Sequence, residues 1–224
     1  MNTLQQIKSG LLSSEEDIKK LSQMESAKFL VISDSHGAPF LMQELIERFA
    51  KSCDGIIFCG DGIGDLFHCI QLSEENKSFA KKLPPVIAYV QGNNDTCSIS
   101  LETGGESKRF TVPPELVFNA CGKEIFVTHG HLYSVYYNLE LLENETISRK
   151  ARIVLYGHTH VPFEQQRNVY IMNPGSIRLP RSQSSAGFAI LEVTKRWTST
   201  IFYKIAYGAN GMETTPYFPA PVFM

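Results

Sequence analysis

The chain has 224 residues, 43% of them hydrophobic and 20% charged, a composition typical of a globular protein with ample material for a core. Its formal net charge of -2 lacks the strong basic excess of proteins that wrap a nucleic-acid backbone, so we expect no stable nucleic-acid complex, although a nucleic-acid fragment stays open as a substrate. The five cysteines include no CxxC pair, no apolar run approaches the roughly 18 residues that span a bilayer, and no secretory signal is recognised, so we expect a cytoplasmic protein without membrane contact.

The first part of the chain is predicted to place a helix in front of a layered domain. Residues 14–24 begin with a capping-type serine and carry Ile18 and Leu21 at helical spacing. We therefore interpret residues 1–27 as an N-terminal helical addition.

Five short, nearly continuous apolar runs follow, which is the pattern of strands buried on both faces. They lie at 29–33, 55–60, 86–92, 124–130 and 152–158. Segments of helical character occur between them, at 40–52, 65–82 and 136–150. Strands that alternate with helices of this length indicate crossover units and a layered α/β domain.

The last third of the chain is β-rich and has no long helical segment. YIMN, GFAILEV and TSTIFYKI are separated by Pro and Ser clusters, which favours an antiparallel sheet that completes one domain spanning residues 1–224. Residues 195–224 are predicted to form a C-terminal strand and an extended tail, because PYFPAPVFM at 216–224 is rich in proline and aromatic residues. An apolar tail of this kind can cover a neighbouring subunit, so a homodimer or homotetramer is expected.

Polar residues follow the apolar runs. In open α/β sheets the ligand crevice lies beyond the carboxyl ends of the strands, so these clusters of Asp, Asn and His are expected to converge. Carboxylate, amide oxygen and imidazole without thiolate are the donors that Mn, Fe, Co or Zn prefer in an open catalytic site. The seven candidate ligands are Asp34, His36, Asp61, Asn93, His129, His158 and His160.

Seven ligands are too many for one ion, but two ions can use them if one carboxylate is shared. Asp61 is the natural bridge, because it follows a central strand and Gly60 lets the backbone come close. His158 and His160 are two residues apart on an extended segment, so both point to one side and each can serve a different ion. Each motif alone is weak, and Gly-Asn-Asn-Asp is more often a plain turn, but together the clusters use five of the six histidines.

The ordered series DSH, GD, GNND, THGH and GHTH resembles the calcineurin-like metallophosphoesterase superfamily, and NPGSIRLPR at 173–181 is most similar to its YfcE-like branch of bacterial and archaeal phosphodiesterases. The resemblance covers residues 28–194 and implies a four-layer α/β/β/α sandwich of two mixed sheets with a binuclear centre at one edge. By position, it assigns Asp34, His36 and His160 to the first ion. It assigns Asn93, His129 and His158 to the second ion, with Asp61 between the two ions.

One position departs from the superfamily pattern. Many members have a histidine after the Asn ligand that acts on the leaving group, whereas this chain has Asn94. An amide cannot act as a general acid at neutral pH, so the leaving group has to depart with help from the metals, from water or from its own acidity, and modest turnover is expected. The YfcE-like branch also commonly lacks a histidine here.

The function implied is hydrolysis of a small phosphodiester by a hydroxide that bridges two divalent ions, with Mn2+ expected first and Zn2+, Fe2+, Ni2+ or Co2+ as alternatives. Asn94 and His131 are the two candidate catalytic residues. His131 can equally be a turn histidine that is hydrogen-bonded to the backbone. Arg178 and Arg181 are candidate substrate-binding residues, or equally solvated surface arginines. Two other functions stay open: a non-catalytic interaction scaffold, like the retromer subunit of this superfamily, and a phosphomonoesterase or protein phosphatase, which Asn94 and the short chain disfavour.

Several neighbouring residues receive structural interpretations. Asn173 and Ser176 are interpreted as shaping their loop, and Asp95 as orienting the loop of Asn93. Cys59 is expected to be buried at a strand end rather than to act as a nucleophile. His68 receives no functional role.

Overall fold

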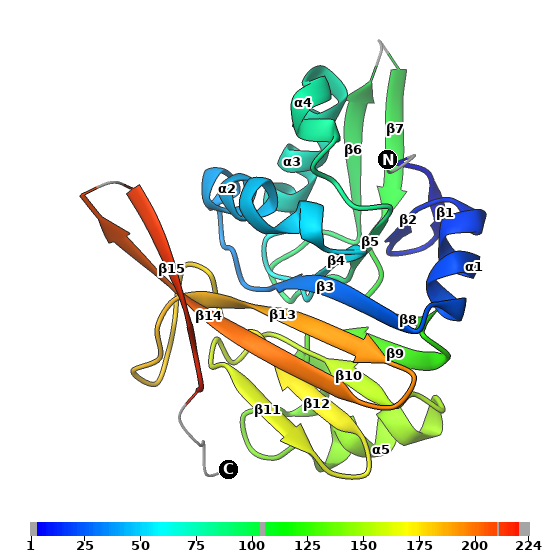
Figure 1. The fold of residues 1–224 in the computed structure, drawn as a ribbon, viewed down its shortest axis with the longest axis vertical. Helices are drawn as coiled ribbons and strands as arrows, with labels where there is room; N and C mark the ends of the chain where they lie inside the picture. Colours follow the sequence, from blue (N-terminus) through cyan, green and yellow to red (C-terminus); the bar gives the residue numbers. More distant parts are fainter. Residues whose placement is uncertain (1–3, 104–105, 210, 220–224) are drawn as a thin grey trace.

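The computed structural model describes residues 4–103, 106–209 and 211–219, and it contains two large sheets (Figure 1). The larger sheet contains, in spatial order, β1 (Gln6–Lys8), β2 (Leu11–Leu12), β5 (Val86–Tyr89), β4 (Gly55–Phe58), β3 (Ser26–Ile32), β13 (Gly187–Thr194), β14 (Thr198–Gly208) and β15 (Gly211–Tyr217). The smaller sheet contains β11 (Phe163–Gln166), β12 (Tyr170–Asn173), β10 (Ile153–Leu155), β9 (Lys123–Thr128) and β8 (Glu115–Ala120). A separate hairpin is formed by β6 (Ser98–Thr103) and β7 (Glu106–Thr111).

Both sheets are mixed, as predicted. In the larger sheet β3, β4 and β5 are parallel, and β13 joins β3 in the antiparallel sense. In the smaller sheet β9, β10 and β12 are parallel, and β8 and β11 flank them as antiparallel strands. The parallel strands end at the same edge of each sheet, which is where the loops that carry the candidate ligands begin.

Helices cover the outer faces of the two sheets, with α2 (Pro39–Phe49), α3 (Ile63–Glu75) and α4 (Lys77–Ala80) on the larger sheet and α5 (Glu140–Ser148) on the smaller one. Helix α1 (Glu15–Gln23) instead packs beside β8, and its Leu21 side chain belongs to the core between the two sheets. Two 3-10 turns are η1 (Ala50–Ser52) and η2 (His131–Tyr133). Within the described residues, no helix is long and apolar enough to cross a membrane.

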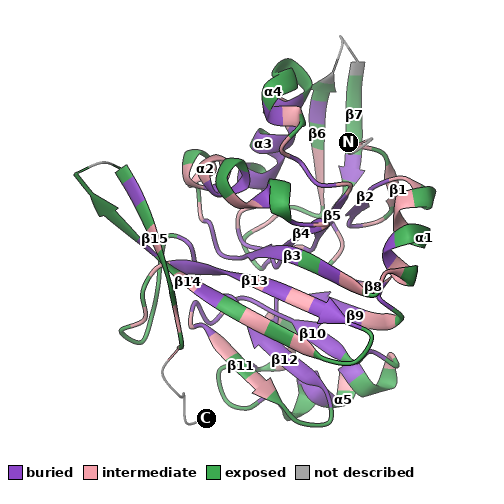
Figure 2. Ribbon diagram, in the orientation of Figure 1, coloured by how far each residue is buried: buried purple, intermediate pink, exposed green. Residues whose placement is uncertain are grey.

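The side chains of β3 show how the layers form, because successive residues point to opposite faces of the sheet. Phe29 lies between the two sheets and meets Phe118 of β8 edge to face, with the ring centroids 6.0 Å apart. Leu30 points the other way, into a core with α2 and α3. A third core packs α5 against the outer face of the smaller sheet. The predicted four-layer α/β/β/α sandwich is therefore confirmed, and Figure 2 shows buried residues along the central strands.

The N-terminal segment differs in part from the prediction of a helical addition. Helix α1 is present and its cap is Ser14, whose hydroxyl accepts a hydrogen bond from the Asp17 N–H at 3.0 Å. In front of it, however, β1 and β2 extend the larger sheet, and Leu11 and Leu12 pair with β5. Strands of three and two residues are too short to show a hydrophobic period, which is why the sequence pattern missed them.

Two other predicted elements also differ. The helix expected at 65–82 is divided, because Asn76 adopts an extended conformation and its side chain caps α4. The C-terminal strand with a tail is instead the hairpin β14–β15, in which Pro216 and Tyr217 of the expected tail pair with β14. Residues 220–224 of that tail lie outside the described residues. The helix predicted at 136–150 begins later, at Glu140.

Replacing Phe29 by alanine is expected to lower the free energy of unfolding by about 3–5 kcal/mol, because it opens a cavity between the two sheets where no side-chain surface is exposed. Urea denaturation measures the change. Leu141→Ala, at an exposed site on α5, is the control and is expected to change stability by less than about 0.5 kcal/mol. Equal losses in the two variants would contradict the assignment of the intersheet core.

Candidate metal centre

Three candidate ligands gather where β3 and β10 end. The Asp34 Oδ1 and His160 Nε2 atoms are 3.1 Å apart, and the Nε2 atoms of His36 and His160 are 3.2 Å apart. His36 Nε2 lies 3.8 Å from Asp34 Oδ1. One ligand atom of each residue lies within 4.8 Å of the ligand atoms of the other two. These three residues therefore form a first candidate ion site.

A second group overlaps the first. It contains Asp34, Asp61 and His129, and His129 Nε2 lies 3.4 Å from Asp61 Oδ2 and 3.9 Å from Asp34 Oδ1. His36 Nε2 also lies 3.7 Å from Asp61 Oδ2 and so joins the two groups. The residue that these two groups share is Asp34, whereas the sequence predicts Asp61 as the bridge. Asp61 Oδ2 lies near the Nε2 atoms of both His36 and His129.

The spacing of these atoms suits metal coordination. Two ligand atoms that are each about 2.1 Å from one ion, at angles between octahedral and tetrahedral, are about 3.0 to 3.4 Å apart. The shortest distances match this range, and the others exceed it by a few tenths of an ångström. Side-chain rotations of ordinary size can make up that difference.

Two buried atoms in the cluster lack hydrogen-bond partners. Asp34 and His129 are fully buried, and among the described residues neither Asp34 Oδ1 nor His129 Nε2 has a hydrogen-bond partner. A buried charged or polar atom without a partner is costly in free energy. Because both atoms point into the same cluster, a divalent cation there would satisfy them, and the residues fit the metal centre that the sequence motifs imply.

The polar atoms of His129, His160 and Asp34 that do not face the cluster are hydrogen-bonded within the protein. His129 Nδ1 lies 2.7 Å from the Cys59 carbonyl oxygen, and His160 Nδ1 lies 2.5 Å from the Leu179 carbonyl oxygen. Bonds of this kind place the N–H on Nδ1 and leave Nε2 to face the cluster, as in protein metal sites. Asp34 Oδ2 accepts hydrogen bonds from the Ser33 hydroxyl and the His158 N–H, so only Oδ1 is free.

The loops that hold these residues have an unusual backbone conformation. Non-glycine residues rarely adopt positive φ, and such strain persists at sites that the surrounding structure holds firmly. Five of the seven candidates adopt it: Asp34 (φ 53), His36 (φ 43), Asp61 (φ 58), His158 (φ 68) and His160 (φ 60).

Glycines beside the ligands allow the loops to approach closely. A Cβ atom on Gly157 would come within 2.0 Å of the Ser33 hydroxyl, and one on Gly92 within 2.1 Å of Asp61 Oδ1. Gly60 has φ +93, and a Cβ atom there would come within 2.9 Å of His129 Nδ1. The predicted close approach of the backbone at Gly60 is therefore confirmed.

Two further carboxylates hold the loops in place. Asp95 accepts hydrogen bonds from the backbone N–H groups of Asp61, Gly62, Ile63 and Gly92, at 2.8 to 2.9 Å. Asp95 thus orients the loop of Asn93, as predicted, and it also fixes the start of α3 beside Asp61.

Asp65 does the same for the loop of His36. Its Oδ2 atom accepts hydrogen bonds from the Ser35 hydroxyl and from the N–H groups of Gly37 and Ala38. On the other side of the centre, Asn173 Nδ2 donates to the Gly157 carbonyl at 2.7 Å. The Ser176 hydroxyl donates to the Asp34 carbonyl, also at 2.7 Å, so the predicted loop-shaping roles of Asn173 and Ser176 are confirmed.

The electrostatics of the cluster favour a charged Asp61 carboxylate. Burial works to raise the pKa of Asp61, but the neighbouring His129 imidazole and hydrogen bonds from Asn94 hold it well below its ordinary value. Burial works to lower the pKa of His129, and the neighbouring Asp61 and Asp34 carboxylates outweigh it and raise that pKa. His158 is different, because burial and the charge of His129 lower its pKa to about 4, so its imidazole is neutral, the form that binds metals.

Four candidates lie at the rim of the cluster, namely Asn93, Asn94, His131 and His158. Asn93 is exposed, and its neighbour Asn94 donates from Nδ2 to Asp61 Oδ2 at 2.6 Å and from its backbone N–H to Asp61 Oδ1 at 2.8 Å. The His158 ring lies 5.0 Å from the His129 ring, centroid to centroid. His131 lies 5.5 Å from the same ring, and its Nδ1 atom is buried and unpaired.

The candidate substrate residues are engaged with the protein. Arg178 donates from Nη1 to the carbonyl oxygens of His36 and Gly37, so it supports the loop of a ligand. Arg181 donates to the hydroxyl of Tyr136, which in turn donates to the His158 carbonyl oxygen at 2.7 Å. The sequence pattern missed Tyr136, because it placed this residue at the start of a helix.

The two cysteines near the cluster behave differently from each other. Cys59 is fully buried, and burial raises the pKa of its thiol well above its ordinary value, so the prediction of a structural role is supported. Its carbonyl oxygen, rather than its sulfur, contacts a candidate ligand. Cys97 is exposed on the loop before β6.

Comparisons with known proteins find relatives of this chain. A model of the calcineurin-like phosphoesterase superfamily domain matches residues 28–196. The probable metallophosphoesterase YsnB of Bacillus subtilis (strain 168) is 31% identical over 175 residues, which cover 78% of this chain and 89% of that protein. Phosphodiesterase YfcE of Escherichia coli (strain K12) is 27% identical, over 74% of this chain and 87% of that protein.

A solved structure shows the same fold. The structure of a conserved uncharacterized protein from Streptococcus pneumoniae TIGR4, described as a predicted phosphoesterase, aligns with a TM-score of 0.60 and 25% identity, over 87% of this chain and 99% of that chain. The resemblance inferred from the motifs is therefore confirmed.

Replacing Asp95 by alanine is expected to lower the free energy of unfolding by about 2–4 kcal/mol, because four backbone N–H groups lose a charged acceptor. Urea denaturation of the metal-free protein measures the loss. Asp54→Ala is the matched control, since Asp54 accepts a hydrogen bond from the single backbone N–H of Lys28, and it should cost about 1 kcal/mol. A loss no larger than that of the control would contradict the role given to Asp95.

Proposed function

The chain belongs to the calcineurin-like phosphoesterase superfamily, and on this basis we propose that it hydrolyses phosphodiester bonds with two divalent metal ions. The observation that carries the proposal is the pair of overlapping ligand groups around the buried Asp34 and Asp61 carboxylates. Asp34 belongs to both groups, and Asp61 Oδ2 lies 3.7 Å from His36 Nε2 of the first group and 3.4 Å from His129 Nε2 of the second, so either carboxylate is near enough to both groups for the bridging role that a two-ion hydrolase needs, and we propose Asp61 for it.

The proposed distribution of ligands follows the cluster. Asp34, His36 and His160 would hold the first ion. The second ion would be held by His129, with His158 and Asn93 turning in from the rim, and Asp61 would lie between the ions. When bound, the two ions make hydroxide available near neutral pH and offset the charge that develops on the phosphoryl oxygens.

The protein's own residues position this chemistry. The carbonyl oxygens of Cys59 and Leu179 fix the ring orientations of His129 and His160, so that both Nε2 atoms face the site. Asn94 holds both oxygens of Asp61 through its side-chain and backbone N–H groups. We assign Asn94 to positioning Asp61 rather than to proton transfer, since an amide cannot protonate a leaving group.

His131 is the proposed substrate contact. Its ring lies 6.1 Å from the His158 ring, centroid to centroid, and its buried Nδ1 atom has no partner among the described residues. A hydrogen bond from this imidazole to a phosphoryl or leaving-group oxygen would satisfy it. Arg181 is the proposed second contact, because its guanidinium is exposed and reaches the Tyr136 hydroxyl beside His158.

We propose Mn2+ as the native ion, with Zn2+, Fe2+, Ni2+ and Co2+ as alternatives. The donor set consists of imidazole nitrogen and carboxylate oxygen without thiolate, which suits these ions and not Cu(I) or an iron–sulfur cluster. A non-catalytic scaffold is the second candidate function. The intact ligand groups and the unpaired atoms directed into them argue against it, because a scaffold has no use for buried polar atoms without partners.

Asp61→Ala and His129→Ala are each expected to reduce the metal content below two ions per chain and to lower kcat/KM on the order of 1,000-fold, because each removes a ligand from the centre. Elemental analysis of the purified variants measures the first effect and phosphodiester hydrolysis the second. His68→Ala, on the surface of α3, is the control and should match the wild type. Two ions per chain with full activity in Asp61→Ala would exclude the proposed bridge.

With Mn2+, bis(4-nitrophenyl) phosphate is expected to have a kcat/KM at least about tenfold above that of 4-nitrophenyl phosphate. The monoester brings an additional negative charge towards the buried carboxylates of Asp34 and Asp61, and the chain has no histidine at position 94 to assist it. Colorimetric assays of released 4-nitrophenolate give both values. Preference for the monoester would favour the phosphomonoesterase, and no hydrolysis with any of the five ions would favour the scaffold.

A further inference from the structure

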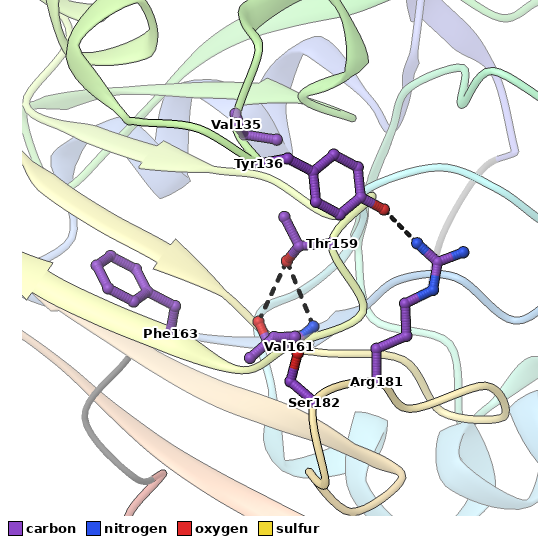
Figure 3. A pocket seen from close by; sticks show the side chains of 7 residues that line it. All are labelled: Val135, Tyr136, Thr159, Val161, Phe163, Arg181 and Ser182. Carbon is purple, nitrogen blue, oxygen red and sulfur yellow. Dashed lines mark hydrogen bonds between the residues drawn. The ribbon is translucent and has the colours of Figure 1, made fainter. Parts of the chain in front are cut away.

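A pocket whose lining includes residues next to the candidate ligands in the chain is drawn in Figure 3. It is formed by the segment before α5, the turn after His158, and the loop after β12, and its cavity has a volume of about 150 Å³. Its lining residues are Val135, Tyr136, Thr159, Val161, Phe163, Arg181 and Ser182. A cavity of this volume is smaller than most drug-sized sites but has room for a single aromatic ring, since an apolar cavity of about 150 Å³ binds benzene.

Tyr136 connects the pocket with the metal centre. Its ring lies 4.9 Å from the His158 ring, centroid to centroid, and its hydroxyl donates to the His158 carbonyl oxygen. Thr159, which lines the pocket, stands between the candidate ligands His158 and His160 in the chain. A group attached to a phosphoryl at the centre is therefore within reach of the pocket.

The side chains that line the pocket are mainly apolar. Val135, Val161 and Phe163 supply apolar side chains, and the Thr159 hydroxyl is turned to the backbone of Val161, as Figure 3 shows. The single charged residue of the lining is Arg181, whose Nη1 atom bonds to the Tyr136 hydroxyl. A site for a second phosphate would need several converging donors, whereas this one suits an uncharged ring.

Large apolar side chains are also exposed on segments that adjoin candidate ligands in the chain. Leu132 and Tyr137 follow His129 within eight residues and are 57% and 82% exposed. Leu179, whose carbonyl oxygen contacts His160, is 47% exposed. Soluble proteins rarely gather exposed apolar groups around a polar site unless the surface binds an apolar ligand.

We propose that this pocket binds a planar aromatic group of the phosphoester substrate. Phe163 and Tyr136 supply aromatic surfaces, and the Arg181 guanidinium can cover the face of the bound ring. The inference rests on the proposed function, because it places the phosphoryl group at the metal centre. It adds a substrate class, esters of aromatic alcohols or of groups that carry an aromatic ring, and a site for that ring.

The test compares two phosphonates that the enzyme cannot hydrolyse. Benzylphosphonate mimics a phenyl phosphate ester with a methylene in place of the ester oxygen, and methylphosphonate has the same charged group without the ring. Isothermal titration of the Mn2+-loaded protein is expected to show that benzylphosphonate binds about 10- to 100-fold more tightly, the gain expected from burying one aromatic ring.

Val161→Phe fills the pocket and is expected to bring the ratio of the two dissociation constants near unity, with the constant for methylphosphonate unchanged. Phe163→Ala is expected to reduce the ratio in part. Tyr207→Ala removes an exposed aromatic residue from β14 and serves as the matched control, with the wild-type ratio retained. Thermal unfolding of each variant checks that it is folded.

The outcomes separate this inference from the proposed function. Equal binding of the two phosphonates by the wild type, or a ratio that Val161→Phe leaves unchanged, would overturn the aromatic pocket. No binding of benzylphosphonate would overturn it as well. A third outcome is that benzylphosphonate binds, that Val161→Phe abolishes this binding, and that methylphosphonate does not bind measurably. This outcome would support the aromatic pocket and would contradict only the proposed metal centre.

Discussion

Two buried carboxylates at the junction of the sheets set the central constraint on this structure. Asp34 and Asp61 are almost completely buried and have the same charge, and both approach the unpaired Nε2 atom of His129. Such a group of residues is unfavourable in a dry interior unless something positive lies among them. A divalent ion with ligands from several loops satisfies this requirement, and the remaining features of the site can be understood as means of holding those ligands.

The ligands occur in strained loops that leave rigid strands. Positive φ angles at residues such as His158 and His160 turn the side chains inward immediately after a buried strand ends. The strain is offset locally, because Asp95 and Asp65 accept seven hydrogen bonds in total from the loops, four for Asp95 and three for Asp65. The arrangement is typical of functional sites, where preorganisation is worth more than local stability.

Much of the fold and of the site could be predicted from the sequence. The apolar runs that became β3, β4, β5, β9 and β10 are continuous, and parallel strands place their carboxyl ends together whatever the loops contain. The clusters that follow β3, β4 and β5 therefore had to meet one another, as did those that follow β9 and β10, whereas the meeting of the two sets depends on how the two sheets pack. The four-layer arrangement required the family resemblance in addition, because alternation of helices and strands alone does not distinguish one sheet from two.

Other features depend on tertiary contacts that leave no local pattern. The strands β1 and β2 exist because Leu11 and Leu12 find partners in β5, distant in the chain. The hairpin β6–β7 had a weak signal in the alternating Ile99 and Leu101, which the surrounding turn residues obscured. The contacts of Tyr136 with His158 and Arg181 join three separate segments, so no window of the sequence contains them.

The candidate ligands come from both halves of the sandwich. Asp34, His36 and Asp61 follow strands of the larger sheet, while His129, His158 and His160 follow strands of the smaller one. Any sliding of one sheet over the other would separate the two sets, so occupancy of the centre and the packing of the sheets are thermodynamically linked. Loading the ions would then lock the relative position of the two sheets, and chelation would loosen the sandwich at its middle layer while leaving each sheet intact.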